Sequence, residues 1–248
     1  MSYTLIILFL FFIGSLFGWI LELFFRRIIN KNKKWVNPGF LVGPYLPLYG
    51  FGLIILYLLA SFGEYIPFEN IYVKRIVLFI IMAIAMTITE FIAGIIFIKK
   101  MKVQLWDYSD EKFNIEGIIC LKYSFFWAVL GAVYYFFIHP HILDALAWLS
   151  ENLAFSFFVG MFYGVFIIDF VYSANIMTKI RRFANENQII VKLEDLKMNI
   201  IQNSEEVKKM KSFIFSISYD KKIKEHLARY GNMKKKLEND FINKIKKR

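Results

Sequence analysis

Cysteine, histidine and proline are scarce in this 248-residue chain, and their scarcity excludes several kinds of site. The single cysteine, Cys120, has no second cysteine to pair with, so an internal disulfide framework is excluded. Two histidines, His139 and His141, fall in a predicted outer loop and His226 lies in the C-terminal segment, which argues against a histidine zinc site. We predict no metal site, and the sequence points to no cofactor.

The motifs of several enzyme classes are also absent. Neither the phosphate-binding pattern G-x-x-x-x-G-K-[ST] nor the zinc-protease pattern H-E-x-x-H occurs in the chain. No basic stretch precedes the first apolar run, which continues to Phe25. We therefore predict an uncleaved first transmembrane helix rather than a signal peptide.

Apolar surface, by contrast, is abundant. The chain is 58% hydrophobic and 19% aromatic, with a mean hydropathy of +0.48, which is more apolar surface than a soluble chain of this length can bury. Five apolar runs approach the ~20 residues that cross a membrane, at residues 3–25, 45–62, 76–98, 118–138 and 153–174. We predict an all-α, multi-pass membrane protein with five transmembrane helices. Gly14-xxx-Gly18 and Gly160-xxx-Gly164 predict close helix packing in the first and fifth helices.

The basic residues between these runs predict the orientation in the cell membrane. Five Lys or Arg follow the first run and four follow the third, whereas two follow the second and none follows the fourth. Basic residues stay on the cytoplasmic side. We therefore predict an outside N-terminus and a cytoplasmic C-terminus, with residues 1–175 as a membrane domain and residues 176–248 as a cytoplasmic tail.

The predicted tail is basic and helical. It holds 19 Lys or Arg against nine Asp or Glu, which predicts contact with anionic lipid headgroups and makes nucleic acid an unlikely partner. Apolar residues recur at spacings of three and four, with one polar position, at Leu193, Leu196, Ile200, Asn203, Val207, Met210, Ile214 and Ile217. A helical hairpin that folds on itself and a coiled coil that makes a homo-oligomer both fit this pattern.

Four ionisable residues lie within the predicted helices, namely Glu22, Glu90, Lys122 and Asp169. A charge at such a depth costs at least ~2.5–3.5 kcal/mol, so we expect the four side chains to point into the bundle and meet. Three carboxylates and one lysine leave an acidic surplus, which must be protonated, paired with Arg26 or Arg27, or matched by a bound cation. The simpler alternative for any one of them is an ion pair that fixes helix packing, and Glu22 alone could reach the membrane interface.

Two stretches that are predicted to face the cytoplasm complete the candidate site. The first, NPGFLVGPYLPLYGFG at residues 37–52, is broken by prolines, and non-helical backbone at membrane depth occurs only where it lines a cavity or is packed in protein. The second, LWDYSDEKFNIEGIIC at residues 105–120, is far more polar than a short connector needs to be. The candidate ligand-binding or gating residues are Glu22, Asn37, Tyr49, Glu90, Trp106, Asp107, Asp110, Asn114, Lys122 and Asp169.

We expect the two stretches to pack together. Trp106 and Tyr108 should lie against Phe40 or Tyr45, and Asp107 or Asn114 should accept hydrogen bonds from the backbone amides that Pro44 frees. Aromatic residues that merely anchor the second stretch at the membrane interface are the alternative.

Four motifs in these regions resemble those of a known family. They are Gly18-Trp19-Ile20-Leu21-Glu22, Asn37-x-Gly39-Phe40-Leu41-x-Gly43-Pro44, Pro47-x-Tyr49-Gly50-Phe51-Gly52, and Trp106-Asp107-Tyr108-Ser109 with Asn114-x-x-Gly117. Over residues 14–169 the chain resembles the ABC-transporter type IV family, the CmpB-like membrane proteins of bacteria. It departs from the family pattern at Pro38 and Ile118, where arginine is usual. The resemblance implies a permease-like protein of the bacterial inner membrane.

Three functions fit these observations. The first is a permease-like protein that binds a small polar or lipid-headgroup ligand at a polar site facing the cytoplasm. The second is a membrane enzyme acting on a lipid or phosphate substrate, with Glu22, Asp107 or Asp110 as acid–base or metal-holding groups. The third is a sensor or scaffold whose tail recruits partners without transport.

Overall fold

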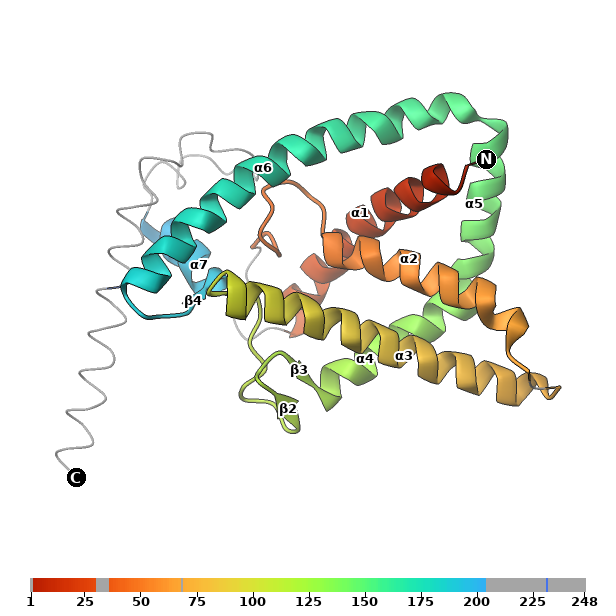
Figure 1. Cartoon of the computed structure of the whole chain (residues 1–248), viewed down its shortest axis with the longest axis horizontal. Helices are drawn as coiled ribbons and strands as arrows, with labels where there is room; N and C mark the ends of the chain where they lie inside the picture. Colours follow the sequence, from red (N-terminus) through yellow and green to blue (C-terminus); the bar gives the residue numbers. More distant parts are fainter. Residues whose placement is uncertain (1, 30–35, 68, 204–230, 232–248) are drawn as a thin grey trace.

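The computed structural model describes residues 2–29, 36–67, 69–203 and 231, and this part of the chain is mostly helical (Figure 1). The α-helices are α1 (Tyr3–Ile29), α2 (Pro47–Phe62), α3 (Ile71–Ile95), α4 (Leu121–Val133), α5 (His139–Glu151), α6 (Ser156–Glu186) and α7 (Leu193–Asn203). Two π-helical segments, η2 (Ile96–Lys100) and η3 (Tyr134–Ile138), extend α3 and α4, and two 3-10 turns are η1 (Gly63–Tyr65) and η4 (Leu153–Phe155).

Two pairs of very short strands join loops of the chain. They are formed by β1 (Val103–Gln104), β2 (Asn114–Ile115), β3 (Ile119–Cys120) and β4 (Val191–Lys192). β2 and β3 pair antiparallel between α3 and α4, and we call residues 105–120, which include this pair, the hairpin. β1 and β4 pair in parallel. The β1–β4 pair therefore ties the segment after α3 to the segment after α6.

Four helical stretches are long and apolar enough to cross a membrane, namely Tyr3–Ile28, Ile71–Lys100, Leu121–Glu151 and Leu153–Glu186. The prediction of a multi-pass, helical membrane protein is confirmed. α2 has 16 residues and is therefore about 24 Å long, which is short of the ~30 Å hydrocarbon core. A fifth crossing depends on α2 and on the non-helical segment before it, and it stays a prediction.

The predicted end of the fourth helix at His139-Pro140-His141 is wrong. α4 continues through η3 into α5, which bends around the end of the bundle near the N-terminus (Figure 1). Pro140 lies in the first turn of α5, directly after the π-helical segment η3, which is a position where helices tolerate proline. Tyr134 and His139 also hydrogen-bond across the junction, with 2.9 Å between Oη and Nδ1.

The residues that matter for the candidate site gather at one end of the bundle. We call this the loop end; it holds residues 101–120, β4 and α7, while the N-terminus and α5 lie at the opposite end (Figure 1). α6 runs without a break through residue 175, the predicted boundary between the membrane domain and the tail. The start of the predicted tail is thus on the same side of the bundle as the hairpin.

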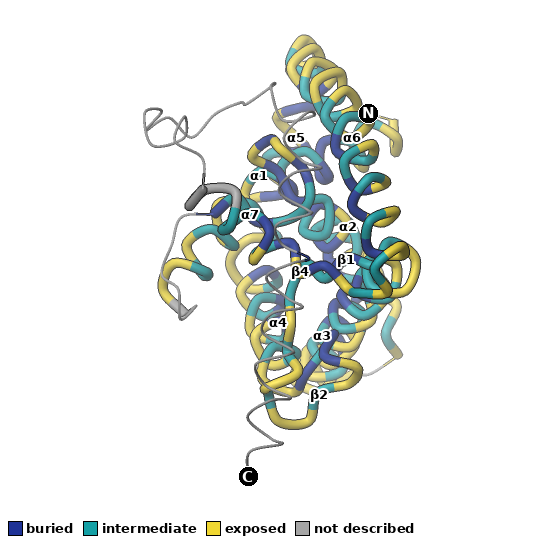
Figure 2. The backbone as a smooth tube through the Cα atoms, turned by 90° about the vertical axis from the view of Figure 1, so that its left-hand side faces the viewer, coloured by how far each residue is buried: buried dark blue, intermediate teal, exposed yellow. Residues whose placement is uncertain are grey.

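Side chains are buried where the helices face one another (Figure 2). One core cluster joins α1 to α6 and includes Leu10, Leu56, Met82, Tyr134 and Leu149. The outer face of α6 leaves Phe157 and Ile168 71% and 73% exposed, as suits a helix in contact with lipid.

A second cluster lies at the loop end and joins β1, β4, α6 and α7. It buries Leu193 and Leu196, the first two positions of the predicted heptad pattern, against α6 and β1 of the same chain. The side chains of the later positions, from 200 to 217, lie outside the described residues, so the choice between hairpin and coiled coil stays open.

The two predicted glycine packing faces have opposite outcomes. An added Cβ at Gly18 would overlap Tyr49 of α2, and one at Gly14 would lie 2.8 Å from Leu53, so α1 packs against α2 through this face as predicted. An added Cβ at Gly160 or Gly164 would meet no described atom within 4 Å. The packing face predicted for α6 is therefore wrong within the described structure.

Candidate functional site

Residues 36–46, which we call the re-entrant segment, are non-helical yet lie deep beside α1. The backbone N–H of Leu46 donates to the carbonyl of Ser15 at 2.9 Å. Ser15 is 14 residues before the C-terminal end of α1, which is a distance of about 21 Å along the helix. Trp19 Nε1 also donates to Asn37 Oδ1 at 2.7 Å. Backbone groups at this depth must find partners within the protein.

Asp169 on α6 supplies the acceptors for the re-entrant segment. Its two carboxylate oxygens accept from the backbone N–H groups of Val42 (3.2 Å) and Gly43 (2.7 Å) and from the hydroxyls of Tyr45 (2.6 Å) and Ser173 (2.8 Å). The prediction that Asp107 or Asn114 caps these amides is wrong.

The carbonyls of the same segment take donors from Asn37 and α7. Asn37 Nδ2 donates to the carbonyls of Leu41 (3.1 Å) and Val42 (2.8 Å). Lys197 Nζ donates to the carbonyls of Asn37 (2.9 Å) and Gly39 (2.7 Å). Burial, and to a lesser degree the nearby Arg26 charge, lowers the pKa of Lys197 to about 7. The helix that starts the predicted tail therefore helps to hold the re-entrant segment.

The hairpin residues singled out by the sequence mostly hold the hairpin itself. Asn114 Nδ2 donates to the carbonyls of Ser109 (3.2 Å) and Glu111 (2.8 Å), and its Oδ1 accepts from the N–H of Gly117. Gly117 has a φ of +66°, which a residue with a side chain rarely adopts. Trp106 Nε1 donates to the carbonyl of Ile118 at 2.8 Å.

Asp107 links the hairpin to β4. It accepts from the N–H of Ser109 at 3.0 Å and from Lys192 Nζ at 2.6 Å. Although burial raises the pKa of Asp107, the bonds from Lys192 and Ser109 outweigh it and lower the pKa to about 2. Asp110, by contrast, is exposed and makes no ion pair or hydrogen bond with the described residues.

A cavity of about 1050 Å³ lies between the helices and is lined by both stretches. Pro38, Gly39 and Phe40 line it from the re-entrant segment, and Leu105, Trp106 and Tyr108 line it from the hairpin. The walls are mainly apolar and include Phe11, Leu21, Phe25, Phe51, Ile55, Ile92, Phe97, Leu130, Phe166 and Phe170. The prediction that the two stretches share one site is thus supported by geometry.

The predicted aromatic contacts between the stretches do not form. Phe40 packs on Phe97 and Phe170, with ring centroids 5.0 and 6.2 Å apart. Tyr108 instead stacks on Tyr123 of α4, with centroids 4.1 Å apart. Both stretches line the cavity, but the Phe40 and Tyr108 rings pack on helices rather than on each other.

An ion-pair network borders the cavity at α1. Arg26 Nε donates to Glu22 Oε1 at 2.7 Å, and Arg26 Nη1 lies 3.3 Å from Glu194 Oε2 of α7. The hydroxyl of Tyr49 donates to Glu22 Oε2 at 2.7 Å. Both oxygens of Glu22 are therefore engaged, and of the alternatives considered for the acidic surplus, pairing with Arg26 occurs at Glu22.

Glu90 is the second carboxylate of the cavity, and it is only half satisfied. The residue is 3% exposed, and its Oε1 accepts from the Tyr108 hydroxyl at 3.0 Å. Burial, followed by the negative charges of Glu90 and Glu22, raises the pKa of Tyr108 well above its usual value, so this hydroxyl stays a donor. Glu90 Oε2 is buried and makes no hydrogen bond of good geometry within the described residues, and the Trp127 indole is the other polar group beside this carboxylate.

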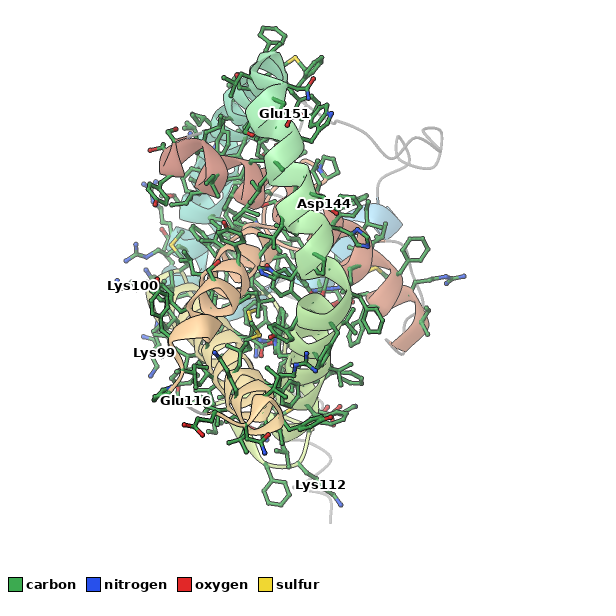
Figure 3. All side chains as sticks on the ribbon, turned by 90° about the vertical axis from the view of Figure 1, so that its right-hand side faces the viewer. Lys99, Lys100, Lys112, Glu116, Asp144 and Glu151 are labelled. Carbon is green, nitrogen blue, oxygen red and sulfur yellow. The ribbon has the colours of Figure 1, made fainter. Side chains whose placement is uncertain are left out.

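The expectation that four ionisable residues meet is wrong for two of them. Glu22 and Glu90 line the cavity. Lys122 lies in the first turn of α4, is 48% exposed and pairs with Glu111 at 2.6 Å. Asp169 binds the re-entrant segment and does not line the cavity. Other charged residues, such as Lys99 and Glu116, which pair at 3.1 Å, point outward from the bundle (Figure 3).

The sequence reasoning missed Glu194, Lys197 and the ring of Trp127. Trp127 lines the cavity from within an apolar run, where nothing distinguishes it from a core residue. Glu194 and Lys197 are three residues apart on α7 and so share a face, and this spacing is the feature of the sequence that could have indicated them. No cluster of three or more potential His, Cys, Asp or Glu metal ligands occurs in the described part of the chain.

A family comparison agrees with this geometry. The family model described as "Putative ABC-transporter type IV" matches residues 9–174. The chain belongs to this family. The match extends from α1 into α6 and includes Glu22, Glu90, the re-entrant segment and the hairpin, whereas β4 and α7 lie beyond it. Comparisons with curated proteins and with solved structures gave no match.

Proposed function

We propose that this type IV family member is a permease-like membrane protein whose cavity binds an amphiphilic ligand. The observation that carries the proposal is the cavity itself, which combines mainly apolar walls with the Glu22–Arg26 pair and Glu90. Its volume of about 1050 Å³ is at the upper end of the ~300–1,000 Å³ of typical ligand sites. Apolar walls favour a hydrocarbon chain, and the charged groups favour a polar head.

The rival functions have less support from the geometry. Of the three carboxylates considered for an enzyme, Glu22 lines the cavity but is bound by Arg26 and Tyr49, and Asp107 and Asp110 do not line it. A sensor role for the tail draws on a specific observation, because Lys192, Glu194 and Lys197 bind the hairpin, α1 and the re-entrant segment respectively. Such contacts would also let the tail regulate a permease.

Filling the cavity should remove its ligand. Ala93 lines the cavity on α3, whereas Ile88 lies on the same helix, is 51% exposed and does not line it. We expect Ala93→Trp, purified in a neutral maltoside detergent, to retain less than about half of the lipid per protein that the unmodified chain retains. Ile88→Trp should retain it all. Quantitative mass spectrometry of extracted lipid measures this ratio, and equal retention by both variants would contradict the proposal.

The orientation is a second part of the proposal, and basic residues of the connecting segments support it. We propose that the N-terminus is outside and that the hairpin and tail are cytoplasmic. In a Cys120→Ser background, an impermeant maleimide added to intact cells should label Ser2→Cys but not Asp110→Cys. Permeabilisation should expose the thiol at position 110. Labelling at position 110 in intact cells would reverse the proposed topology.

A further inference from the structure

Glu90 Oε2 indicates which chemistry the polar head of a ligand must bring. Glu90 lines the cavity and is 97% buried, and its Oε2 makes no hydrogen bond of good geometry with the described residues, although the Trp127 indole lies beside this carboxylate. An unmatched buried acceptor is costly, and the cost is larger for a charged group. A ligand head in this position therefore needs to donate to Glu90 rather than accept from it.

Aromatic rings frame the same part of the cavity. Tyr49 and Trp127 pack with centroids 5.3 Å apart, Tyr108 stacks on Tyr123, and all four rings line the cavity. The Tyr49 hydroxyl also donates to Glu22 and the Tyr108 hydroxyl donates to Glu90, so the rings adjoin both carboxylates. Ring faces attract cations, and cages of aromatic residues bind ammonium groups.

The basic side chain that an anionic head would need is already paired with carboxylates of the protein. Arg26 is the only Lys or Arg among the described residues that line the cavity, and it is shared between Glu22 and Glu194. Glu22 and Glu90 together outnumber it, so the lining offers one more acidic than basic group. The balance of charge favours a positively charged group in the cavity over a purely anionic one.

We propose that the cavity binds a membrane lipid whose head carries a positively charged amine, and that Glu90 binds this amine between the surrounding rings. The inference rests on the proposed function, since it presumes that an amphiphile occupies the cavity. Phosphatidylethanolamine has such a head, and its ammonium group can donate N–H to Glu90. Phosphatidylcholine has the same charge on a quaternary ammonium without an N–H, and phosphatidylglycerol has the same phosphate and no amine. Glu90 would donate no proton and break no bond; its role is to bind.

The test compares these lipids, all with dioleoyl chains, on delipidated protein in a neutral maltoside detergent. Lipid binding is followed by native mass spectrometry and by the shift in melting temperature. We expect phosphatidylethanolamine to bind at least about tenfold more tightly than phosphatidylglycerol, and more tightly than phosphatidylcholine, whose ammonium group has no N–H to donate. Glu90→Gln should abolish this preference, and Glu116→Gln, on a carboxylate that is 50% exposed, should preserve it.

Each of the other possible outcomes contradicts one stated part of the proposal. If all three lipids bind equally to the unmodified chain, the amine inference fails while the cavity remains a lipid site, and this result does not depend on the folding of any variant. If none binds, the proposed function fails as well. If soluble O-phosphoethanolamine stabilises the protein as much as the lipid at equal concentration, the ligand is a free polar molecule and the lipid part is wrong.

Discussion

Replacing Asp169 with alanine should lower the free energy of unfolding by at least about 3 kcal/mol. Its carboxylate accepts four hydrogen bonds, two of them from backbone amides of the re-entrant segment. Bonds to a charged acceptor are worth ~1.5–3 kcal/mol each, and amides left unpaired at membrane depth add their own cost. A denaturant titration in detergent micelles, followed by tryptophan fluorescence, measures the change.

Two further variants give this experiment its controls. Asp169→Asn keeps the side-chain volume but replaces one acceptor oxygen with a donor, so we expect an intermediate loss of stability. Asp110→Ala removes an exposed carboxylate that contacts no described partner and should change stability by no more than about 0.5 kcal/mol. Equal stabilities for the Asp169 and Asp110 variants would show that the re-entrant segment does not depend on α6.

The membrane class and most helices followed from the sequence because hydrophobicity acts over whole runs of residues. Roughly 20 apolar residues in a row have few alternatives to a transmembrane helix. Helix ends were harder to predict. Pro140 predicted a stop, yet a proline in a first turn is compatible with a helix that restarts at once. The sequence alone does not show which of these two roles a proline has.

The candidate site was predicted less well because it depends on how each helix is rotated. Glu22 and Glu90 reach the cavity as expected, but Asp169 faces the re-entrant segment. Val42 and Gly43, whose backbone amides donate to Asp169, lie 127 and 126 residues before it in the chain, and no local sequence pattern relates them. Lys122 was placed too deep, since β3 delays the start of α4 to Leu121 and leaves the lysine beside Glu111 at the loop end.

Removing Arg26 should have the second large effect. Its guanidinium is 17% exposed and is shared between Glu22 and Glu194, so Arg26→Met would leave two partly buried carboxylates without their basic partner. Removing one side of a buried pair costs ~3–5 kcal/mol, and the partial exposure of this pair reduces the expected loss to about 2–3 kcal/mol. The denaturant titration measures it, and Arg181→Met, at an exposed position of α6, should cost less than about 0.5 kcal/mol.

Variants of the two carboxylates that Arg26 binds distinguish how much stability comes from its pair in the cavity and how much from its pair with α7. In the Arg26→Met background, Glu22→Gln should restore part of the lost stability, because the neutral amide still accepts from the Tyr49 hydroxyl and leaves no unpaired charge. Glu194→Gln in the unmodified chain should instead loosen α7, which is also held by Lys197 on the re-entrant segment and by the second core cluster. Faster proteolysis near residue 190 would report that loosening. If Glu194→Gln leaves both proteolysis and stability unchanged, Arg26 acts through Glu22 alone, and the start of the tail is held by Lys197 and the second core cluster rather than by the ion-pair network.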